Sequence, residues 1–313
     1  MKLLVGYDGS QCADAALDDL KNAGLPVKCF ALVVTVAEVW LPPPPPPAYE
    51  FAGLAEVDEN PAIKFRYEKE LGKVEEAKAL AARAAARLKA NFPDWEISTE
   101  EASGSPAWEL ISKAEQWKPD LIVIGSHGRS ALGRLILGSV SQRVLTEATC
   151  SVRIARGRVE ESSPVRIIVG VDGSPGAEAA LRSAAAREWP ALSEARVVVV
   201  DDPIEPTAAT ELVPFVSKSL DDADREFREK LAGMVEGMAG RLKSPNLAAA
   251  AIVAEGDPKR VIVKMAEEWG ATCIFVGSTG FSSRLARVLI GSISSAIAAR
   301  AHCSVEVVRQ PKG

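Results

Sequence analysis

Basic charge and long apolar segments are what this sequence has little of. Its 37 Lys and Arg residues are outnumbered by 42 Asp and Glu residues, and the net charge of -5 leaves no broad basic surface for a phosphate backbone or an anionic membrane. No apolar run approaches the roughly 18 residues of a membrane-spanning helix, and the apolar stretch before Asp8 is too short for a signal peptide. We therefore expect a cytoplasmic protein whose main partner is neither nucleic acid nor a membrane.

Clustered metal ligands are also missing. The five cysteines form no CxxC pair and are odd in number, and the sequence has only two histidines. Structural zinc requires closely grouped Cys or His ligands, and a disulfide framework uses cysteines in pairs. We predict neither a disulfide framework nor a metal site, and we interpret the cysteines as small core residues.

An internal repeat is the clearest feature that is present. MKLLVGYDGS at residues 1–10 returns as VRIIVGVDGS at residues 165–174, LIVIGSHG returns in part as IFVGSTG, and LILGSVS returns as VLIGSIS. A chain of 313 residues is long enough for two domains of about 150 residues each. We predict a first domain over residues 1–156 and a second over residues 164–313, with the polar segment RGRVEESSP as the linker.

The two repeats differ most between Val36 and Gly104, where the second copy is twelve residues shorter. The extra length of the first copy contains WLPPPPPPAYEFAG, whose six consecutive prolines cannot donate to a β ladder and favour an extended conformation. We predict a loop insertion that belongs to the first domain alone. It is either a docking segment for an aromatic-lined groove or a stiff spacer.

Apolar and amphipathic runs alternate along the first repeat. LVVTV and LIVI are continuous apolar runs of the kind found in strands buried on both faces, and the Ala-, Glu- and Lys-rich segment near residue 80 favours a long helix. We predict strands over residues 2–7, 27–36, 96–101, 121–124 and 151–155. We predict helices over residues 11–23, 63–91, 106–116 and 140–147. This alternation indicates an α/β fold with a parallel sheet covered on both faces, which binds ligands beyond the carboxyl ends of its strands.

Glycines gather where the fourth predicted strand ends. Gly125 and Gly128 follow LIVI directly and let the backbone turn and approach a ligand closely, and Gly138 and Ser139 open the next helix. The free amides and the positive dipole end of a helix N-terminus favour an anion. This loop therefore predicts a phosphate-binding site.

Two further side chains belong to the same edge of the predicted sheet. Asp8 ends the first strand, where a carboxylate either contacts ribose hydroxyls or a magnesium ion, or caps the following helix. His127 lies inside the glycine loop and is able to donate to a phosphate oxygen. Its counterpart in the second repeat is Thr279, so a donor rather than a titrating group suffices there, and we predict no catalytic residue.

The spacing of Gly125, Gly128, Gly138 and Ser139 resembles the ATP-binding signature of the universal stress protein family. The DGS after the first strand, the Gly-x-Pro at Gly104 and the closing CSVRIAR are similar to that family too. The resemblance covers both repeats. It implies two Rossmann-like, doubly wound five-stranded parallel sheets with the strand order 3-2-1-4-5, each with adenine near strands one and two and phosphates on the glycine loop.

The resemblance also implies roles for individual residues. Asp8 would contact ribose, and Val36 and Ile124 would contact adenine. The phosphates would be held by Gly125, His127, Gly128, Gly138, Ser139 and Val140. The corresponding residues of the second repeat are Asp172, Gly277, Gly280, Gly291 and Ser292.

The second glycine loop departs from this pattern. Ten residues separate Gly280 from Gly291, where nine separate Gly128 from Gly138. The extra residue either displaces the phosphate-binding amides, so that the second site is weaker or empty, or forms a harmless bulge near residues 284–287. We favour the first alternative.

The function implied is that of an ATP-binding stress-response regulatory protein, which changes its conformation or its affinity for an unidentified protein partner. ATP would bind there with or without Mg²⁺. The alternatives are a slow ATPase or nucleotidyl-transferring enzyme, or an interaction module with empty sites. The sequence has no GxxxxGK[ST] loop and no Lys within the first glycine loop, which argues against turnover.

The closing strands predict how the repeats associate. Val152-Arg153-Ile154 and Val305-Glu306-Val307 alternate apolar and charged residues, as edge strands packed on one face do. In the family that this chain resembles, this strand pairs antiparallel across a two-fold axis. We therefore expect an intramolecular pseudo-dimer with Arg153 facing Glu306, and we leave homodimer formation open.

Overall fold

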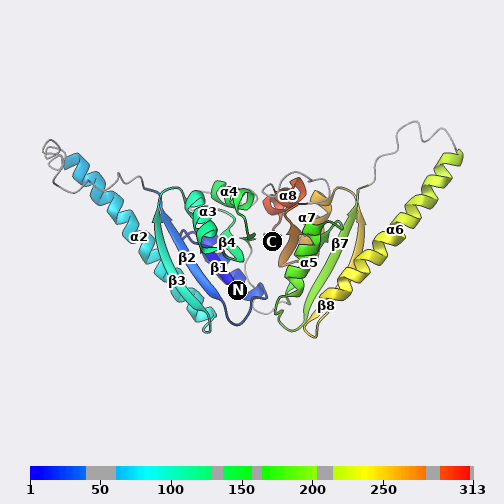
Figure 1. Cartoon of the computed structure of the whole chain (residues 1–313), viewed down its shortest axis with the longest axis horizontal. Helices are drawn as coiled ribbons and strands as arrows, with labels where there is room; N and C mark the ends of the chain where they lie inside the picture. Colours follow the sequence, from blue (N-terminus) through cyan, green and yellow to red (C-terminus); the bar gives the residue numbers. More distant parts are fainter. Residues whose placement is uncertain (40–60, 129–136, 157–163, 203–213, 280–289, 311–313) are drawn as a thin grey trace.

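A computed structural model describes residues 1–39, 61–128, 137–156, 164–202, 214–279 and 290–310. Ten strands form one continuous sheet in the order β3-β2-β1-β4-β5-β10-β9-β6-β7-β8, and helices cover both of its faces (Figure 1). The first five strands belong to the first repeat and the last five to the second.

The first repeat has the alternation expected from its sequence. Its strands are β1 (Lys2–Gly6), β2 (Phe30–Ala37), β3 (Glu96–Ser103), β4 (Leu121–Gly125) and β5 (Ser151–Ala155). Its helices are α1 (Gln11–Asp19), which a 3-10 turn extends over Leu20–Asn22, α2 (Pro61–Asn91), α3 (Pro106–Trp117) and α4 (Ser139–Glu147). Strand β2 begins at Phe30 and not at the predicted Val27, since Val27 is 61% exposed and follows Pro26, which has no N–H to donate.

The second repeat follows the same plan. Its strands are β6 (Arg166–Val171), β7 (Ser193–Asp201), β8 (Leu247–Glu255), β9 (Cys273–Gly277) and β10 (Ser304–Val308). Its helices are α5 (Pro175–Ala185), α6 (Pro214–Leu242), α7 (Pro258–Trp269) and α8 (Ser292–Arg300). Within each repeat every pair of neighbouring strands is parallel, and the predicted order 3-2-1-4-5 is confirmed in both.

The period of two along the strands divides the core into layers. Leu3 and Val5 of β1 pack with α1 and α2, whereas Leu4 points to the opposite face and packs with α3 and α4. The second repeat places α5 and α6 on one face and α7 and α8 on the other. The apolar layer under α3, α4, α7 and α8 is one cluster that runs through both repeats, so the two repeats share a core.

The repeats join through β5 and β10, the one antiparallel pair among the ladders of the described strands. Val305 lies opposite Ile154, Glu306 opposite Arg153, and Val307 opposite Val152. The predicted intramolecular pairing of the closing strands is thereby confirmed, including the position of Arg153 against Glu306.

Three sequence predictions concern residues at or beyond the limits of the described segments. The proline run at residues 42–47 and Gly280 lie outside the described residues. Arg156, which we predicted both as the last residue of the first domain and as the first residue of the linker, is 7% exposed and bonded to the second repeat, so only its place in the linker is wrong. Within the described part of the chain, no helix combines the length and apolar character needed to cross a bilayer, and no group of His, Cys, Asp or Glu side chains is arranged to hold a metal ion.

Candidate functional site

A cavity of about 620 Å³ opens at the carboxyl edge of the first repeat's sheet, where β1, β2 and β4 end. Helix α2 contributes one wall, and the start of α4 contributes another. Every site residue predicted for the first repeat lines this cavity: Asp8, Val36, Ile124, Gly125, His127, Gly128, Gly138, Ser139 and Val140. The parallel topology brings them together because it places the carboxyl ends of these strands side by side.

The turn between β1 and α1 fixes the carboxylate of Asp8. Gly9 has a φ of 77°, a conformation that favours glycine. Asp8 Oδ1 accepts a hydrogen bond from the Ser10 amide (2.9 Å), and Ser10 Oγ accepts one from the Ala13 amide (3.1 Å). Ser10 is therefore the N-cap of α1, and the interpretation of Asp8 as that cap is wrong. Asp8 is held at the edge of the cavity with its Oδ2 close to Gly128.

His127 lines the cavity and carries a buried polar atom without a partner among the described residues. Its ring Nδ1 lies 2.9 Å from Ser126 Oγ, whereas Nε2 is buried and has no hydrogen-bond partner among the described residues. Burial lowers the pKa of His127, and the positive charge of Arg156 lowers it further. When Ser126 donates to Nδ1, the neutral ring carries its proton on Nε2 and is able to donate to a bound ligand.

Thr35 offers a second such atom and was missed by the sequence reasoning. Its side chain is buried in β2, lines the cavity, and has an Oγ1 with no hydrogen-bond partner in the described part of the chain. Buried polar atoms are almost always hydrogen-bonded in folded proteins, so Thr35 Oγ1 and His127 Nε2 are two exceptions, both in residues that line this cavity. The signal in the sequence was the single hydroxyl in the otherwise apolar strand FALVVTVA.

The structural reason for glycine is not the same at each glycine position of the predicted loop. None of them has a φ in the left-handed region, so the turn itself does not demand glycine. A Cβ on Gly125 would lie 2.9 Å from the backbone C and O of Cys12, which shows that Gly125 serves the packing of α1 against β4. A Cβ on Gly138 would meet its nearest atoms at 3.4 Å, an ordinary contact. Among the described residues, neither packing nor conformation therefore requires glycine at Gly138.

Helix α4 begins at this cavity. Its N-cap, Gly138, is extended with a φ of -64° and a ψ of 154°, and no side chain caps the helix. The Gly138 amide donates to Ser126 O (2.9 Å), and Ser141 Oγ donates to Gly125 O (2.8 Å). These two hydrogen bonds hold the start of the helix against the end of β4. The amides of the first turn are thus presented to the cavity by a fixed helix, and such a terminus attracts anions.

The wall formed by α2 could not be found from the glycine motif, because it lies far from it in the sequence. Lys73, Glu76, Ala77 and Leu80 line the cavity from this helix. Lys73 Nζ lies 3.0 Å from Glu70 Oε1 and 3.5 Å from Glu38 O. The side of the cavity that faces α2 therefore carries both the ammonium group of Lys73, which pairs with Glu70, and the carboxylate of Glu76.

The second repeat preserves the framework of the site. Asp172 Oδ1 accepts from the Ser174 amide (2.9 Å), the Gly291 amide donates to Ser278 O (2.6 Å), and Gly291 is the N-cap of α8, which begins at Ser292. The structure therefore brings Asp172, Gly277, Gly291 and Ser292 into the arrangement of their counterparts.

The approach of the first helix to the fourth strand differs between the repeats. A Cβ on Gly277 would lie 2.3 Å from the carbonyl carbon of Gly176, closer than the 2.9 Å found between Gly125 and Cys12. Gly176 takes the place of Cys12, and a Cβ there would lie 2.2 Å from Thr279 O. Helix α5 thus packs more tightly against the end of β9 than α1 does against β4, and only glycine at position 176 permits this.

Comparison with known proteins agrees with this description. A universal stress protein of Mycobacterium tuberculosis, Rv2005c, is 27% identical over 319 residues, which span 98% of this chain and 97% of the relative. A solved universal stress protein from Archaeoglobus fulgidus has 22% identity and a TM-score of 0.60 over 98% of both chains, which shows the common fold. A family member from Arabidopsis thaliana, solved with AMP bound, matches 47% of this chain and 94% of its own at 16% identity and a TM-score of 0.31, a likeness that carries no conclusion about the ligand here.

The family assignment rests on both halves of the chain. Residues 1–156 and residues 165–309 each match the model of Usp, the universal stress protein family. The chain belongs to the universal stress protein family and contains two copies of its domain.

Proposed function

We propose that the first repeat binds ATP and that the protein acts as a nucleotide-dependent regulatory protein of the stress response. The observation that carries this proposal is the convergence of nine motif residues on one cavity at the carboxyl edge of the sheet. A volume of about 620 Å³ lies within the range of small-molecule and cofactor sites.

Different residues of the cavity suit the adenine, the ribose and the phosphates of the nucleotide. Val36 and Ile124 offer apolar contacts to the adenine, and the Asp8 carboxylate accepts hydrogen bonds from the ribose hydroxyls. The first-turn amides of α4 and Nε2 of His127 donate to phosphate oxygens. A magnesium ion bound with ATP would take its protein ligand from Asp8, because carboxylate oxygens suit this cation.

The regulatory part of the proposal rests on α2. This helix of 31 residues lines the cavity near its middle and extends well beyond the sheet on its N-terminal side (Figure 1). A ligand that contacts Lys73 or Glu76 changes the environment of a rigid element that reaches far from the site. A protein partner in the cytoplasm would then bind this helix with an affinity that depends on whether the cavity holds nucleotide.

The proposal is tested first on the unmodified protein. Freshly purified chain is denatured, the released small molecules are identified by mass spectrometry, and ATP, ADP, AMP and cAMP are titrated by calorimetry. We expect adenine nucleotide in the released fraction and the tightest binding for ATP. A chain that binds none of the four contradicts the proposal.

A matched pair of variants then locates the site. Gly138→Val places a branched side chain where the phosphates approach, and we expect it to abolish ATP binding at the first repeat with the circular dichroism spectrum unchanged. Gly291→Val makes the same change at the second repeat and should leave that binding intact. ATP binding by Gly138→Val at the parent affinity would remove the phosphate-cradle interpretation.

A further inference from the structure

An arginine follows the closing strand in each repeat, and each of the two crosses the junction into the other repeat. Arg156 follows β5 and Arg309 follows β10, and their exposed fractions are only 7% and 8%. They are repeat equivalents, since TCSVRIAR and HCSVEVVR end on them.

Arg309 contacts the C-terminal end of α4 in the first repeat. Its Nη2 donates to Leu145 O (2.8 Å) and Thr146 O (3.0 Å), and its backbone amide donates to Ser151 Oγ (3.2 Å). The last turn of α4 has no basic residue of its own. The charge at this end of the helix is therefore supplied by the second repeat.

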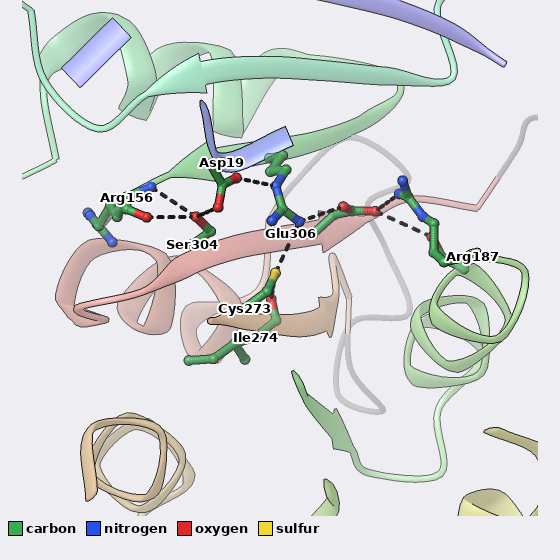
Figure 2. A network of polar contacts seen from close by, with 9 residues as sticks. Asp19, Arg156, Arg187, Cys273, Ile274, Ser304 and Glu306 are labelled. Carbon is green, nitrogen blue, oxygen red and sulfur yellow. Dashed lines mark hydrogen bonds and ion pairs between the residues drawn. The ribbon is translucent and has the colours of Figure 1, made fainter. Parts of the chain in front are cut away.

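Arg156 makes the reciprocal contacts. Its Nη1 donates to Ala298 O (2.6 Å) and Ala301 O (3.1 Å) at the end of α8. Its backbone amide donates to Ser304 Oγ (2.9 Å), a contact that Figure 2 shows. The same geometry thus occurs twice, once in each direction across the junction. Such a recurrence indicates a built feature of the junction and not a single fortuitous contact.

The two helices held in this way are the ones that open at the nucleotide cavity and at its counterpart. Helix α4 begins after Gly138, and α8 begins after Gly291. The last carbonyl groups of a helix have no partner within it, and a cation there is favourable because of the helix dipole. A helix of nine residues is about 13 Å long, so a displacement at one end moves the amides at the other.

We propose that the nucleotide site of the first repeat is completed by the second repeat, with Arg309 as the positioning residue that holds α4. The guanidinium of Arg309 stays charged and fixes the C-terminal carbonyls of α4, so that the first-turn amides of Ser139 and Val140 face the phosphates. Arg156 does the same for α8. This inference rests on the proposed function and adds that neither repeat forms a complete phosphate site by itself.

The test compares ATP with adenosine, which lacks phosphates, in the full chain. Arg309→Met removes the charge and keeps an apolar stem of similar length. We expect ATP to bind about 3- to 30-fold more weakly to this variant, in line with the energy of a cation at a helix C-terminus, and adenosine to bind as it does to the parent. Arg309→Lys, which restores a charged donor, should recover part of the ATP affinity.

The control is Arg187→Met, which also removes a buried junction arginine. Arg187 pairs with Glu306 and, among the described residues, forms no hydrogen bond with α4. We expect this variant to lower the melting temperature at least as much as Arg309→Met and to leave the ratio of ATP to adenosine affinity unchanged.

The outcomes separate the two proposals. A parent chain that binds no ATP overturns both. A parent that binds ATP, together with an Arg309→Met variant of equal ATP affinity, overturns the positioning role alone. Equal weakening of ATP and adenosine by Arg309→Met, or the same change of their ratio by Arg187→Met, would mean that the junction only stabilises the fold, and this also overturns it.

Discussion

Arg153 and Glu306 stand opposite each other in the antiparallel pair that joins the two repeats, with 3.3 Å between Nη1 and Oε2 and both side chains fully buried. Asp19 of α1 contacts Arg153 Nε at 2.7 Å, and Arg187 contacts Glu306 Oε1 at 2.5 Å. The four charges alternate in sign and come from both repeats. Each buried charge therefore has a partner of opposite sign, which a buried charge requires.

Removal of one member of this network should be costly. Glu306→Ala leaves Arg153 with only Asp19 and takes the carboxylate from Arg187, and we expect the free energy of unfolding to fall by about 3–5 kcal/mol. Urea denaturation measures this loss. The control is Glu226→Ala, which breaks an exposed pair with Lys230 and should change stability by no more than about 0.5 kcal/mol. A loss for Glu306→Ala as small as that of the control would contradict the role of the network.

Acid sensitivity should depend on His127. Because the pKa of His127 is lowered in the folded protein, the unfolded chain binds its proton more readily. The associated stability is fully present above the unfolded pKa of about 6.5 and is lost as the pH falls through the lower folded pKa. His127→Thr, which introduces the residue of the second repeat, should make unfolding by urea less dependent on pH between about 7.5 and 5. Identical pH profiles for parent and variant would show that the burial of His127 has no such effect.

The two glycines of the loop should respond differently to a methyl group. Gly125→Ala places a Cβ against the backbone of Cys12, and we expect a loss of about 1–3 kcal/mol through overpacking. Gly138→Ala meets only ordinary contacts and should retain the parent's stability within about 0.5 kcal/mol. Thermal melts of the two variants provide the measurement. Equal destabilisation would mean that Gly138, like Gly125, serves packing.

The two repeats should also differ in ATP affinity. Asp8→Ala and Asp172→Ala remove equivalent carboxylates that accept from equivalent serine amides, so their effects on the turn are matched. We expect Asp8→Ala to weaken the tight ATP site about tenfold or more and Asp172→Ala to leave it unchanged, because the glycine loop of the second repeat is one residue longer. Calorimetry on each variant measures this. Equal losses of ATP affinity in the two variants, with two equivalent sites per parent chain, would show that the extra residue has no effect on ATP binding.

Much of the fold follows from local patterns in the sequence. The repeat, the apolar runs and the DGS turns each specify a strand, a helix start or a register from neighbouring residues alone. Gly9 and Gly173 illustrate this, since both adopt a positive φ at the same point of each repeat. The pairing of Arg153 with Glu306 was also predicted, because the family resemblance implied antiparallel closing strands and the sequence shows that the two residues are repeat equivalents of opposite sign.

Other features depend on residues that only the folded chain brings together. Thr35 and Lys73 line the cavity although neither belongs to the glycine motif. Asp19 of α1 and Arg187, which follows α5, complete the buried network from the two repeats. The sequence placed Arg156 at the boundary between the first domain and a polar linker, whereas in the structure its guanidinium donates to carbonyl groups at the end of α8. A charged residue beside a polar segment looks solvated when its neighbours in space are unknown.

The sequence by itself determined the two domains, the order of their elements and the residues at the carboxyl edge of the first sheet, because turns, helix caps and strand burial act over a few neighbouring residues. Only the tertiary structure decided that the repeats share one core and that Arg156 and Arg309 each donate hydrogen bonds to backbone carbonyls of the other repeat. The carbonyl groups that these arginines bind belong to the backbone, which carries no side-chain signal in a sequence, and they acquire their position only when β5 and β10 pair.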